Sequence, residues 1–326
     1  MAEQIKVARE GAVEIISFCN PPMNFISNVM LKEFREELLR LRDDDSVRVL
    51  VLTGGMKDSF VTHYDVSELV EYSKSAPRPP AALNNTISGL VCGMLRKAHR
   101  HAWLEKFIIK LFSTRPPAEQ GIFYWARCMD ILDTMPKPII AAISGMSLGG
   151  GCEISLCCDF RFMARHPNNL YRIGLPEVLV GIIPGGTGTP PRLPRIVGEA
   201  KALEMLMTGT LYTPDEAEAM GLIHKALNPD ELMPTVMELA GRLSRGAPIA
   251  LASIRENVRF GSRLAWPQAR VVDMAVTNRA IFSNDAIKGM ERYVQKVAQH
   301  DTFDLQVVLD EAKDLLEGRE VHYEGK

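Results

Sequence analysis

The sequence predicts an α/β fold in which strands and helices alternate through the first two-thirds of the chain, after which the elements are nearly all helical. Two apolar runs, RVLVLT at 48–53 and IIAAI at 139–143, are typical of strands buried on both faces of a sheet. Later in the chain, apolar residues recur at helical spacing. The chain has 326 residues, of which 46% are hydrophobic, so it can bury the core of one large domain.

The expected elements begin with a hairpin formed by residues 5–8 and 13–18 around Glu10-Gly11. Ser27 is expected to cap a helix that runs to Leu41, and Thr213-Pro214 is expected to open another helix. Strands are further expected at 48–53, 139–143 and 160–164, and helices at 66–72, 122–132, 149–157, 200–207, 215–220, 229–241, 248–259, 267–282, 286–298 and 303–316.

Residues 73–80 are expected to be a linker, and the segment 81–120 that follows has a different character. In it, basic residues are interleaved with apolar ones at the spacing of an amphipathic helix. Such a helix can lie on a membrane surface or bind calmodulin, but we favour a helix that packs against its own protein. The basic residues are Arg96, Lys97, Arg100, Lys106 and Lys110.

Charge and cysteine content exclude several classes of protein. Lys and Arg number 38 and Asp and Glu number 40, and this near balance argues against a nucleic-acid-binding protein. The longest uncharged apolar stretch, 138–152, is too short to span a bilayer, and the first residues contain no apolar leader. Six cysteines without C-x-x-C spacing predict reduced thiols in a cytoplasmic protein. No metal site is expected, because His99 and His101 lack carboxylate or cysteine partners nearby.

The strongest local signal is AAISGMSLGGGCEISLCCDF at 141–160. In this segment a buried strand leads to three glycines, Gly149 to Gly151, and then to a helix. Glycine lets a ligand approach the backbone closely. The unpaired N–H groups at a helix start attract developing negative charge. The pattern therefore indicates an oxyanion site.

A competing interpretation starts from Gly145 to Gly149, which fit G-x-S-x-G, the nucleophile elbow of α/β-hydrolases. Three fixed positions in five recur often by chance, and the HGGG-type loop of those enzymes is missing upstream. If Ser147 were the nucleophile, its candidate partners would be Asp215, Asp230, His224 and His300.

Several sequence blocks occur in a fixed order along the chain. They are NPPMNFIS at 20–27, VRVLVLTGG at 47–55, KPIIAAISGMSLGGGCEISLCCDFRFMA at 137–164, IGLPEVLVGIIPGG at 173–186 and FSNDAIKGM at 282–290. With these blocks, the chain resembles the crotonase (enoyl-CoA hydratase/isomerase) superfamily over most of residues 1–300. Several ordered blocks are more specific than one pentapeptide, so the resemblance favours the oxyanion interpretation over the nucleophile elbow.

The resemblance implies an architecture: a crotonase-like spiral of ββα units with a C-terminal helical region and a helical insertion. The spiral core is expected over 1–225, with the insertion at about 75–120. Residues 226–326 are expected to form the helical trimerisation region and a tail. Members of this family assemble as homotrimers or as hexamers that are dimers of trimers, and the same assembly is expected here.

The resemblance also implies a chemistry. An acyl-CoA thioester carbonyl is expected to sit between the backbone N–H groups of Tyr64 and Gly150, which would stabilise an enolate. The positions of the two hydratase glutamates are matched by Glu153 and Glu177. Two carboxylates in one apolar pocket repel each other, which raises the pKa of one of them.

The predicted function is addition of water to a 2-enoyl-CoA, within fatty acid metabolism. Two alternatives remain open: another crotonase reaction (isomerase, C–C hydrolase or lyase), and a non-catalytic acyl-CoA-binding or scaffold paralogue. The expected partner is the acyl-CoA substrate, and no cofactor is expected beyond the coenzyme A that belongs to it. The residues implied in substrate or CoA binding are Met23, Asn24, Thr62, Asp65, Val66, Gly149 and Pro176.

The sequence departs from the family pattern at three places. His63 replaces a glycine before the first oxyanion donor, and it could contact a polar acyl group. The loop that contains 166–170 is longer than expected. Tyr64 and Gly150 lie about twice as far apart along the chain as in the family, mainly because of residues 75–120. We hypothesise that this insertion is a lid over the acyl pocket or an oligomer contact, with basic residues that could meet CoA phosphates.

Overall fold

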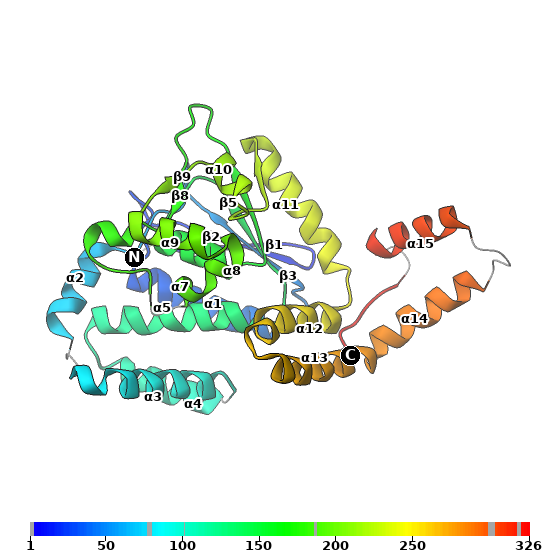
Figure 1. Cartoon of the computed structure of the whole chain (residues 1–326), viewed down its shortest axis with the longest axis horizontal. Helices are drawn as coiled ribbons and strands as arrows, with labels where there is room; N and C mark the ends of the chain where they lie inside the picture. The colour runs from blue at the N-terminus through cyan, green and yellow to red at the C-terminus, as the bar shows by residue number, and fades with distance from the viewer. Residues whose placement is uncertain (1–2, 77–79, 101, 186–187, 299–303, 318–320) are drawn as a thin grey trace.

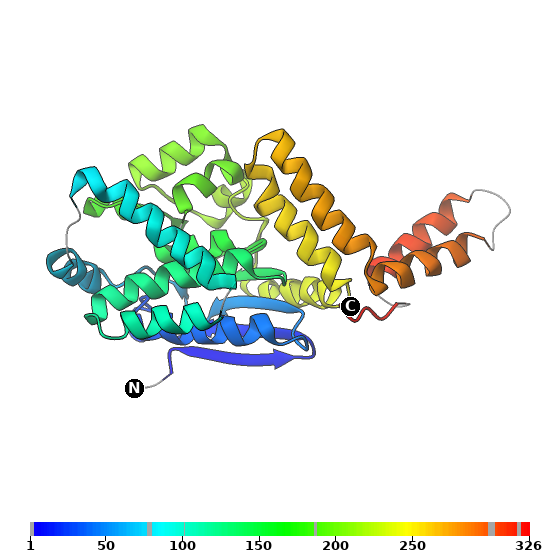
Figure 2. The ribbon, with the colours of Figure 1, turned by 90° about the horizontal axis from the view of Figure 1, so that it is seen from below.

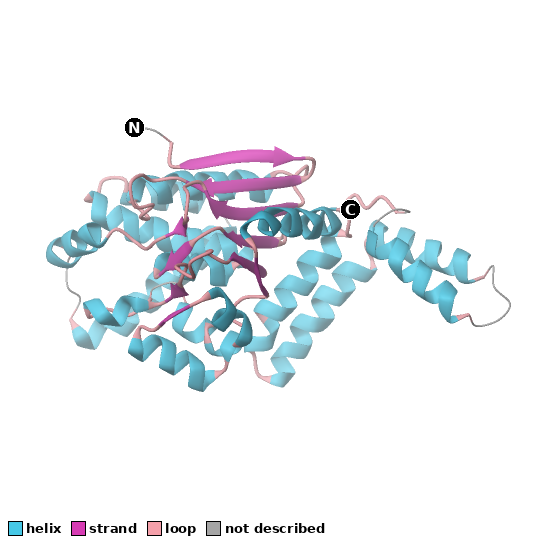
Figure 3. Cartoon of the chain, turned by 90° about the horizontal axis from the view of Figure 1, so that it is seen from above, coloured by secondary structure: helices cyan, strands magenta, loops and turns pink. Residues whose placement is uncertain are grey.

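The computed structural model describes residues 3–76, 80–100, 102–185, 188–298, 304–317 and 321–326. Its main layer is a six-stranded sheet in the order β1-β2-β3-β5-β7-β10. Only β1 and β2 are antiparallel, and the other neighbours run parallel, with β1 as the outermost strand (Figure 3). The strands are β1 (Ile5–Glu10), β2 (Val13–Phe18), β3 (Val49–Gly54), β5 (Ile139–Ile143), β7 (Phe160–Ala164) and β10 (Lys225–Leu227).

A second, smaller sheet lies beside the first in the order β4-β6-β8-β9. Its strands are β4 (Ser59–Val61), β6 (Met146–Leu148), β8 (Ile173–Gly174) and β9 (Leu211–Tyr212). The sequence did not predict any of these four strands, because two or three residues are too few for a period to be recognised. This sheet matters for the site, since β4 and β6 each end close to a predicted oxyanion donor.

The helices occur close to the predicted ranges. Ser27 and Thr213 cap α1 and α10 through their side chains, as expected. The helices are α1 (Asn28–Asp43), α2 (Val66–Ser75), α3 (Ala81–Arg100), α4 (Ala102–Phe112), α5 (Pro117–Thr134), α6 (Gly150–Cys157), α7 (Thr189–Arg192), α8 (Pro194–Val197), α9 (Glu199–Thr208), α10 (Pro214–Ala219), α11 (Pro229–Ser244), α12 (Pro248–Arg259), α13 (Trp266–Ile281), α14 (Asn284–Val297) and α15 (Leu305–Glu317), with the 3₁₀ helices η1 (Pro176–Val180) and η2 (Gly261–Arg263).

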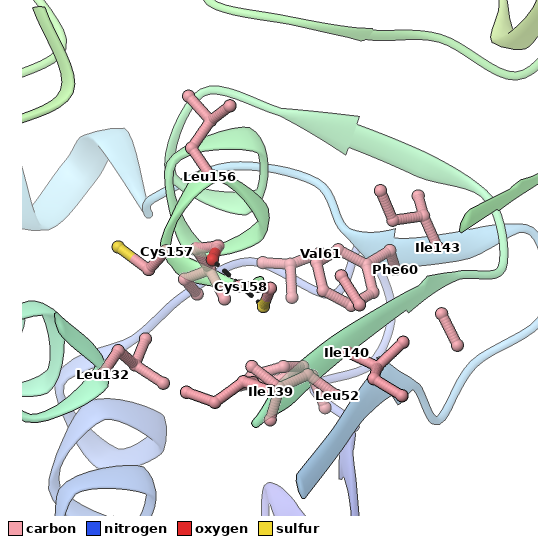
Figure 4. Packing of buried hydrophobic residues seen from close by; sticks show 14 of the residues in the cluster. Leu52, Phe60, Val61, Leu132, Ile139, Ile140, Ile143, Leu156, Cys157 and Cys158 are labelled. Carbon is pink, nitrogen blue, oxygen red and sulfur yellow. Dashed lines mark hydrogen bonds between the residues drawn. The ribbon is translucent and has the colours of Figure 1, made fainter. Parts of the chain in front are cut away.

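The core lies between the sheets and the helices. Helix α11 packs against β2, β3, β5 and β7, whereas α5 packs against α1 and α6. Every residue of β5 is buried, as its unbroken apolar sequence predicts. Figure 4 shows Leu52 and Ile140 of the sheet packed near Phe60, Val61 and the end of α6. The oxyanion segment is therefore held inside the core rather than on a surface loop.

The insertion forms two helices, α3 and α4, where one amphipathic helix was expected (Figures 1 and 2). The predicted linker at 73–80 is wrong at its start, because α2 continues to Ser75, and residues 77–79 lie outside the described part of the chain. Ile108 of α4 is buried, and the ring of Phe112 stacks on Phe123 of α5 at 4.4 Å. The insertion therefore packs on its own protein. The side chains of Arg96, Lys97, Arg100 and Lys106 lie outside the described residues.

Arginines cap the C-terminal end of α6, which is buried along its whole length. The carbonyl oxygen of Leu156 accepts from Arg192 at 3.3 Å, that of Cys157 from Arg259 at 2.6 Å and that of Cys158 from Arg161 at 2.9 Å. The last carbonyls of a helix have no partner within the helix and carry partial negative charge. The arginines therefore donate hydrogen bonds to the last carbonyls of α6, which are buried away from water.

The same cluster also anchors α12 to α5. Arg255 of α12 donates to the carbonyl of Leu132 at 2.6 Å and to the carboxylate of Asp159 at 2.9 Å. Asp159 also accepts from Arg259, and Asp133 accepts from Arg192 and Arg259. Because Arg255 is buried, its hydrogen bonds join three separate segments of the chain without competition from water.

No helix in the described part of the chain is long and apolar enough to cross a membrane. All six cysteines are free and four are buried, which confirms the expectation of reduced, mostly buried thiols. Burial raises the pKa of Cys128, Cys152, Cys157 and Cys158, so these thiols stay protonated.

We expect Arg255→Met to lower the free energy of unfolding by about 3–5 kcal/mol, because it leaves buried carbonyls and a carboxylate without their donor. The matched control is Lys201→Met, which breaks a solvent-exposed pair with Glu204 and should leave the free energy of unfolding nearly unchanged. Urea unfolding followed by circular dichroism measures both. Equal, small losses would show that the arginine cluster does not hold α12 in place.

Candidate active site

A cavity of about 340 Å³ opens where α5, α6 and η1 meet the chain after β4. Its lining is mostly apolar, with carboxylates at only two positions. The residues that line it are His63, Tyr64, Val66, Leu69, Ile122, Trp125, Gly149, Gly150, Glu153, Pro176, Glu177, Leu179, Val180, Ile182, Ile183, Pro184 and Gly185. The structure thus brings together Tyr64, Gly150, Glu153 and Glu177, the four residues to which the sequence assigned the chemistry.

The N–H group of Tyr64 takes no part in the backbone ladder beside it. Ile26 donates to the carbonyl of His63 at 2.8 Å and accepts from the N–H of Asp65 at 2.9 Å, so the ladder uses the residues on either side of Tyr64. In an extended chain, the backbone N–H groups of successive residues point to opposite sides. The N–H of Tyr64 therefore points away from Ile26. No acceptor for it is present among the described residues.

The second amide belongs to Gly150, the first residue of α6, where an N–H has no partner within the helix. A Cβ added at Gly150 would lie 3.5 Å from the nitrogen of Tyr64, so the two backbones are close neighbours. Two amides without an acceptor, one of them at the positive end of a helix dipole, can stabilise an oxyanion in this cavity.

Two glycines at the start of α6, Gly149 before it and Gly151 in its first turn, are required by its position. Gly149 has φ +50°, a conformation that residues with a side chain rarely adopt. A Cβ at Gly151 would lie 2.0 Å from the carbonyl oxygen of Val61. The first turn of α6 can therefore pack onto β4 only with glycine at these two positions.

The two glutamates face the cavity in different states. Glu153 is in the first turn of α6 and is buried. Both carboxylate oxygens of Glu177 are buried and have no hydrogen-bond partner. Burial raises the pKa of Glu177 to about 7, and the negative charge of Glu153 contributes to the increase. As the sequence predicted, the pair contains one carboxyl group that holds its proton near neutral pH.

The nucleophile-elbow interpretation does not agree with this geometry. Ser147 lies within β6, paired with Val61 and Ile173, and not on the turn that leads into α6. It is fully buried and does not line the cavity. Its candidate partners are engaged elsewhere: Asp215 pairs with Arg165, and Nδ1 of His224 accepts from the N–H of Arg161. His300 lies outside the described residues.

Comparison with known proteins agrees with this geometry. Residues 8–86 and 123–302 match the family model described as enoyl-CoA hydratase/isomerase. The chain belongs to the enoyl-CoA hydratase/isomerase family. The resemblance to the crotonase superfamily is thereby confirmed. The family model leaves 87–122 unmatched, and these residues include most of α3, all of α4 and the start of α5.

Several relatives match nearly the whole chain. Crotonyl-CoA hydratase of Syntrophomonas wolfei is 28% identical over 90% of this chain and 96% of its own length. Short-chain-enoyl-CoA hydratase of Clostridium acetobutylicum is 29% identical, over 88% of this chain and 93% of its own. The crystal structure of an enoyl-CoA hydratase from Bacillus anthracis superposes with a TM-score of 0.69 at 25% identity, covering 90% of this chain and 96% of that one. The α/β fold with its C-terminal helices is that of the family.

This member of the family departs from the common pattern beside the first amide. Nδ1 of His63 lies 2.7 Å from the carbonyl oxygen of Tyr64, and the ring stacks on Phe25 at 4.3 Å. Because a carbonyl only accepts, Nδ1 is the donor in this contact. The phenol of Tyr64 donates to Asn28 at 3.2 Å, and burial raises its pKa.

The residues expected to bind CoA fall into two groups. Val66, Gly149 and Pro176 line the cavity, but Met23, Asn24, Thr62 and Asp65 do not. Those four shape the backbone beside it. The Asn24 side chain is fully buried and bridges the N–H of Asn20 and the carbonyl of Phe60, Thr62 donates to the carbonyl of Met23, and Asp65 caps α2.

The sequence missed the apolar walls of the cavity. Ile122 and Trp125 come from α5, and the Trp125 ring meets Tyr64 edge-on at 6.0 Å. Leu179 and Ile183 come from the segment after Glu177. No described residue between 77 and 121 lines the cavity, so the role of the insertion as a lid stays a hypothesis. A helical pattern shows that α5 has an apolar face, but not which of its residues reach a ligand.

We expect Glu177→Gln to stabilise the protein at high pH. The pKa of Glu177 in the folded protein, about 7, lies above its ordinary value of 4.5. The folded state therefore loses stability as pH rises from 4.5 through 7, because ionisation of a buried carboxyl group is unfavourable. The variant should be more stable than the parent by about 1–3 kcal/mol at pH 8, and equal to it near pH 4.5.

Urea unfolding at the two pH values measures this difference. Glu238→Gln, at an exposed position of α11, is the matched control and should have no effect at either pH. A stability difference for Glu177→Gln that does not change with pH would contradict the raised pKa.

Proposed function

We propose that this protein adds water across the double bond of a 2-enoyl-CoA thioester. The observation that carries the proposal is one apolar cavity that contains two backbone amides without acceptors and two glutamates, of which one has a raised pKa. The names of two relatives, crotonyl-CoA hydratase and short-chain-enoyl-CoA hydratase, support the same reaction. Glu177 is near its pKa at neutral pH, which suits a proton donor.

In the proposed mechanism, the thioester oxygen accepts hydrogen bonds from the N–H groups of Tyr64 and Gly150. Glu153 takes a proton from a water molecule while the oxygen of that water forms a bond to Cβ of the substrate. The electrons of the double bond move toward Cα and onto the thioester oxygen, which gives the enolate. The enolate then collapses as Glu177 gives its proton to Cα. Each amide donor would lower the barrier by about 2.7–4 kcal/mol. The assignment of the two glutamates could be exchanged.

The CoA part of the substrate would lie along the backbone near Met23, Asn24, Thr62 and Asp65. This segment is rigid, because Asn24 and Thr62 hold it by side-chain hydrogen bonds. We propose no cofactor besides this coenzyme A. We also propose a cytoplasmic location, supported by six free cysteines.

We expect Glu153→Gln and Glu177→Gln each to lower kcat by about 10²–10⁴-fold, the usual contribution of a general acid or base. The assay follows the loss of enoyl-thioester absorbance with crotonyl-CoA and with longer 2-enoyl-CoA substrates. Ser147→Ala is the control and should stay active, since Ser147 does not line the cavity. Binding of CoA thioesters without turnover of any substrate would instead favour the non-catalytic alternative.

The pH profile is a second readout of this prediction. Because Glu177 must carry a proton to act as the acid, kcat/KM should fall as pH rises through about 7. A profile that rises through this range would mean that Glu177 acts as the base and that the two roles are exchanged.

We further propose that the protein assembles as a homotrimer or a hexamer through its C-terminal helices. Helices α14 and α15 project from the body of the molecule (Figure 1). Large apolar side chains are exposed on α13, on α14 and at the turn between them, which is unusual for a monomer and typical of an interface. They include Trp266, Met274, Phe282, Ile287, Met290, Tyr293 and Val294.

We expect light scattering with size-exclusion chromatography to give three or six times the subunit mass of 36.3 kDa. The double variant Phe282→Asp, Val294→Asp should shift the mass toward one subunit, because it buries charges in an apolar interface. Gln295→Asp adds a charge at an exposed position of the same helix and is the control. A monomeric parent protein would overturn this proposal.

A further inference from the structure

A second cavity, of about 410 Å³, lies at the other end of α6. It is bounded by the C-terminal part of α6, by α8 and by α12 with η2. Its lining shares no residue with the cavity that holds the glutamates. A volume of this size is within the ~300–1,000 Å³ typical of small-molecule sites.

The lining of this cavity is rich in positive charge. Asp159 is the only acidic residue among the described residues that line it, and Asp133 lies behind it, paired with Arg192 and Arg259. The positive charge is therefore largely uncompensated. The arginines that line the cavity are Arg161, Arg192, Arg195, Arg255, Arg259 and Arg263.

Helix capping accounts for part of this cluster but not for all of it. The caps of α5 and α6 use Arg161, Arg192, Arg255 and Arg259. Arg195 and Arg263 cap neither helix. Arg195 donates to the carbonyl of Ser262 at 3.1 Å, and the guanidinium of Arg263 lies 6.0 Å from the centre of the Phe260 ring. Neither has an ion-pair partner among the described residues.

Arg192 supplies a buried donor to the same place. Its side chain is 5% exposed, and its Nε has no hydrogen-bond partner. A buried guanidinium N–H without an acceptor is costly, so it indicates an acceptor that is not part of the chain. Burial lowers the pKa of Arg263. The charge of Asp133 opposes this shift, whereas the charges of Arg192, Arg195 and Arg259 add to it.

We propose that this cavity binds a small organic anion, whose phosphate or carboxylate head contacts Arg192, Arg195 and Arg263. Guanidinium groups present forked donors that match both of these heads. The remaining wall is apolar and includes Ile196, Leu251, Ile254 and Val258, so the ligand has an apolar body. Ile254 and Val258 are more than half exposed, which leaves the apolar side of the cavity accessible from solvent.

The experiment measures binding to the full-length protein in its native assembly by isothermal titration calorimetry and by the shift in melting temperature. The probes are phenyl phosphate and phenylacetate, which carry the two head groups on the same ring, together with inorganic phosphate and benzyl alcohol. A ligand that binds only the folded state raises its melting temperature in a concentration-dependent way. We expect one of the two ring-bearing anions to bind more tightly than inorganic phosphate, and benzyl alcohol not to bind. The anion that binds more tightly shows whether the ligand carries a phosphate or a carboxylate head group.

The variant Arg195→Gln, Arg263→Gln should weaken binding of the preferred anion at least tenfold. Both positions are exposed and take part in no cap, so the variant should keep the circular dichroism spectrum of the parent. Arg270→Gln, at an exposed arginine of α13 outside the cavity, is the control for the loss of a surface arginine and should bind like the parent. The proposal is overturned if no anion binds, or if the double variant binds as tightly as the control.

Discussion

Everything at the site depends on the burial of α6 from its first residue to its last. A helix of eight residues, about 12 Å long, has partial charge at both ends that water would normally satisfy. In this protein the two ends of α6 differ in their hydrogen-bond partners. At the C-terminal end, the carbonyls of Leu156, Cys157 and Cys158 accept from arginines. At the N-terminal end, the N–H of Gly150 has no acceptor among the described residues and lies beside a cavity. The unsatisfied end is the one that can contribute binding energy to a developing oxyanion.

The position of α6 also explains the sequence around it. Its first turn packs so closely on β4 that a side chain at Gly151 would collide with the carbonyl of Val61, and Gly149 has a positive φ. The same close approach brings Gly150 beside Tyr64, which lies three residues beyond the end of β4. The backbone of Tyr64 is fixed by Ile26 on one side and by the ring of His63 on the other. His63, which the resemblance places where the family has a glycine, therefore leaves the first amide without an acceptor among the described residues, and it lines the cavity.

These packing constraints determine how much of the fold and of the site could be predicted from the sequence. The strand at 139–143 was predicted to the residue, because burial on both faces gives an unbroken apolar run. The meeting of Glu153 and Glu177 could be expected only from the resemblance, since no local pattern links a helix to a 3₁₀ turn. The short strands β4, β6, β8 and β9 could not be predicted, because their pairing depends on segments far apart in the chain. For the same reason, the apolar wall formed by Trp125 became visible only once α5 was placed beside α6.

The carboxylates near the two ends of α6 differ in the charged groups that surround them. Asp133 and Asp159, at the C-terminal end, are paired with arginines at 2.6–3.0 Å. Glu177, near the N-terminal end, has no cation or hydrogen-bond donor on its carboxylate, and its pKa rises to about 7. A single guanidinium beside Glu177 would stabilise the charged carboxylate and remove its proton at neutral pH. The arginines lie at one end of α6 and the glutamates near the other, and this separation leaves the pKa of Glu177 raised by burial.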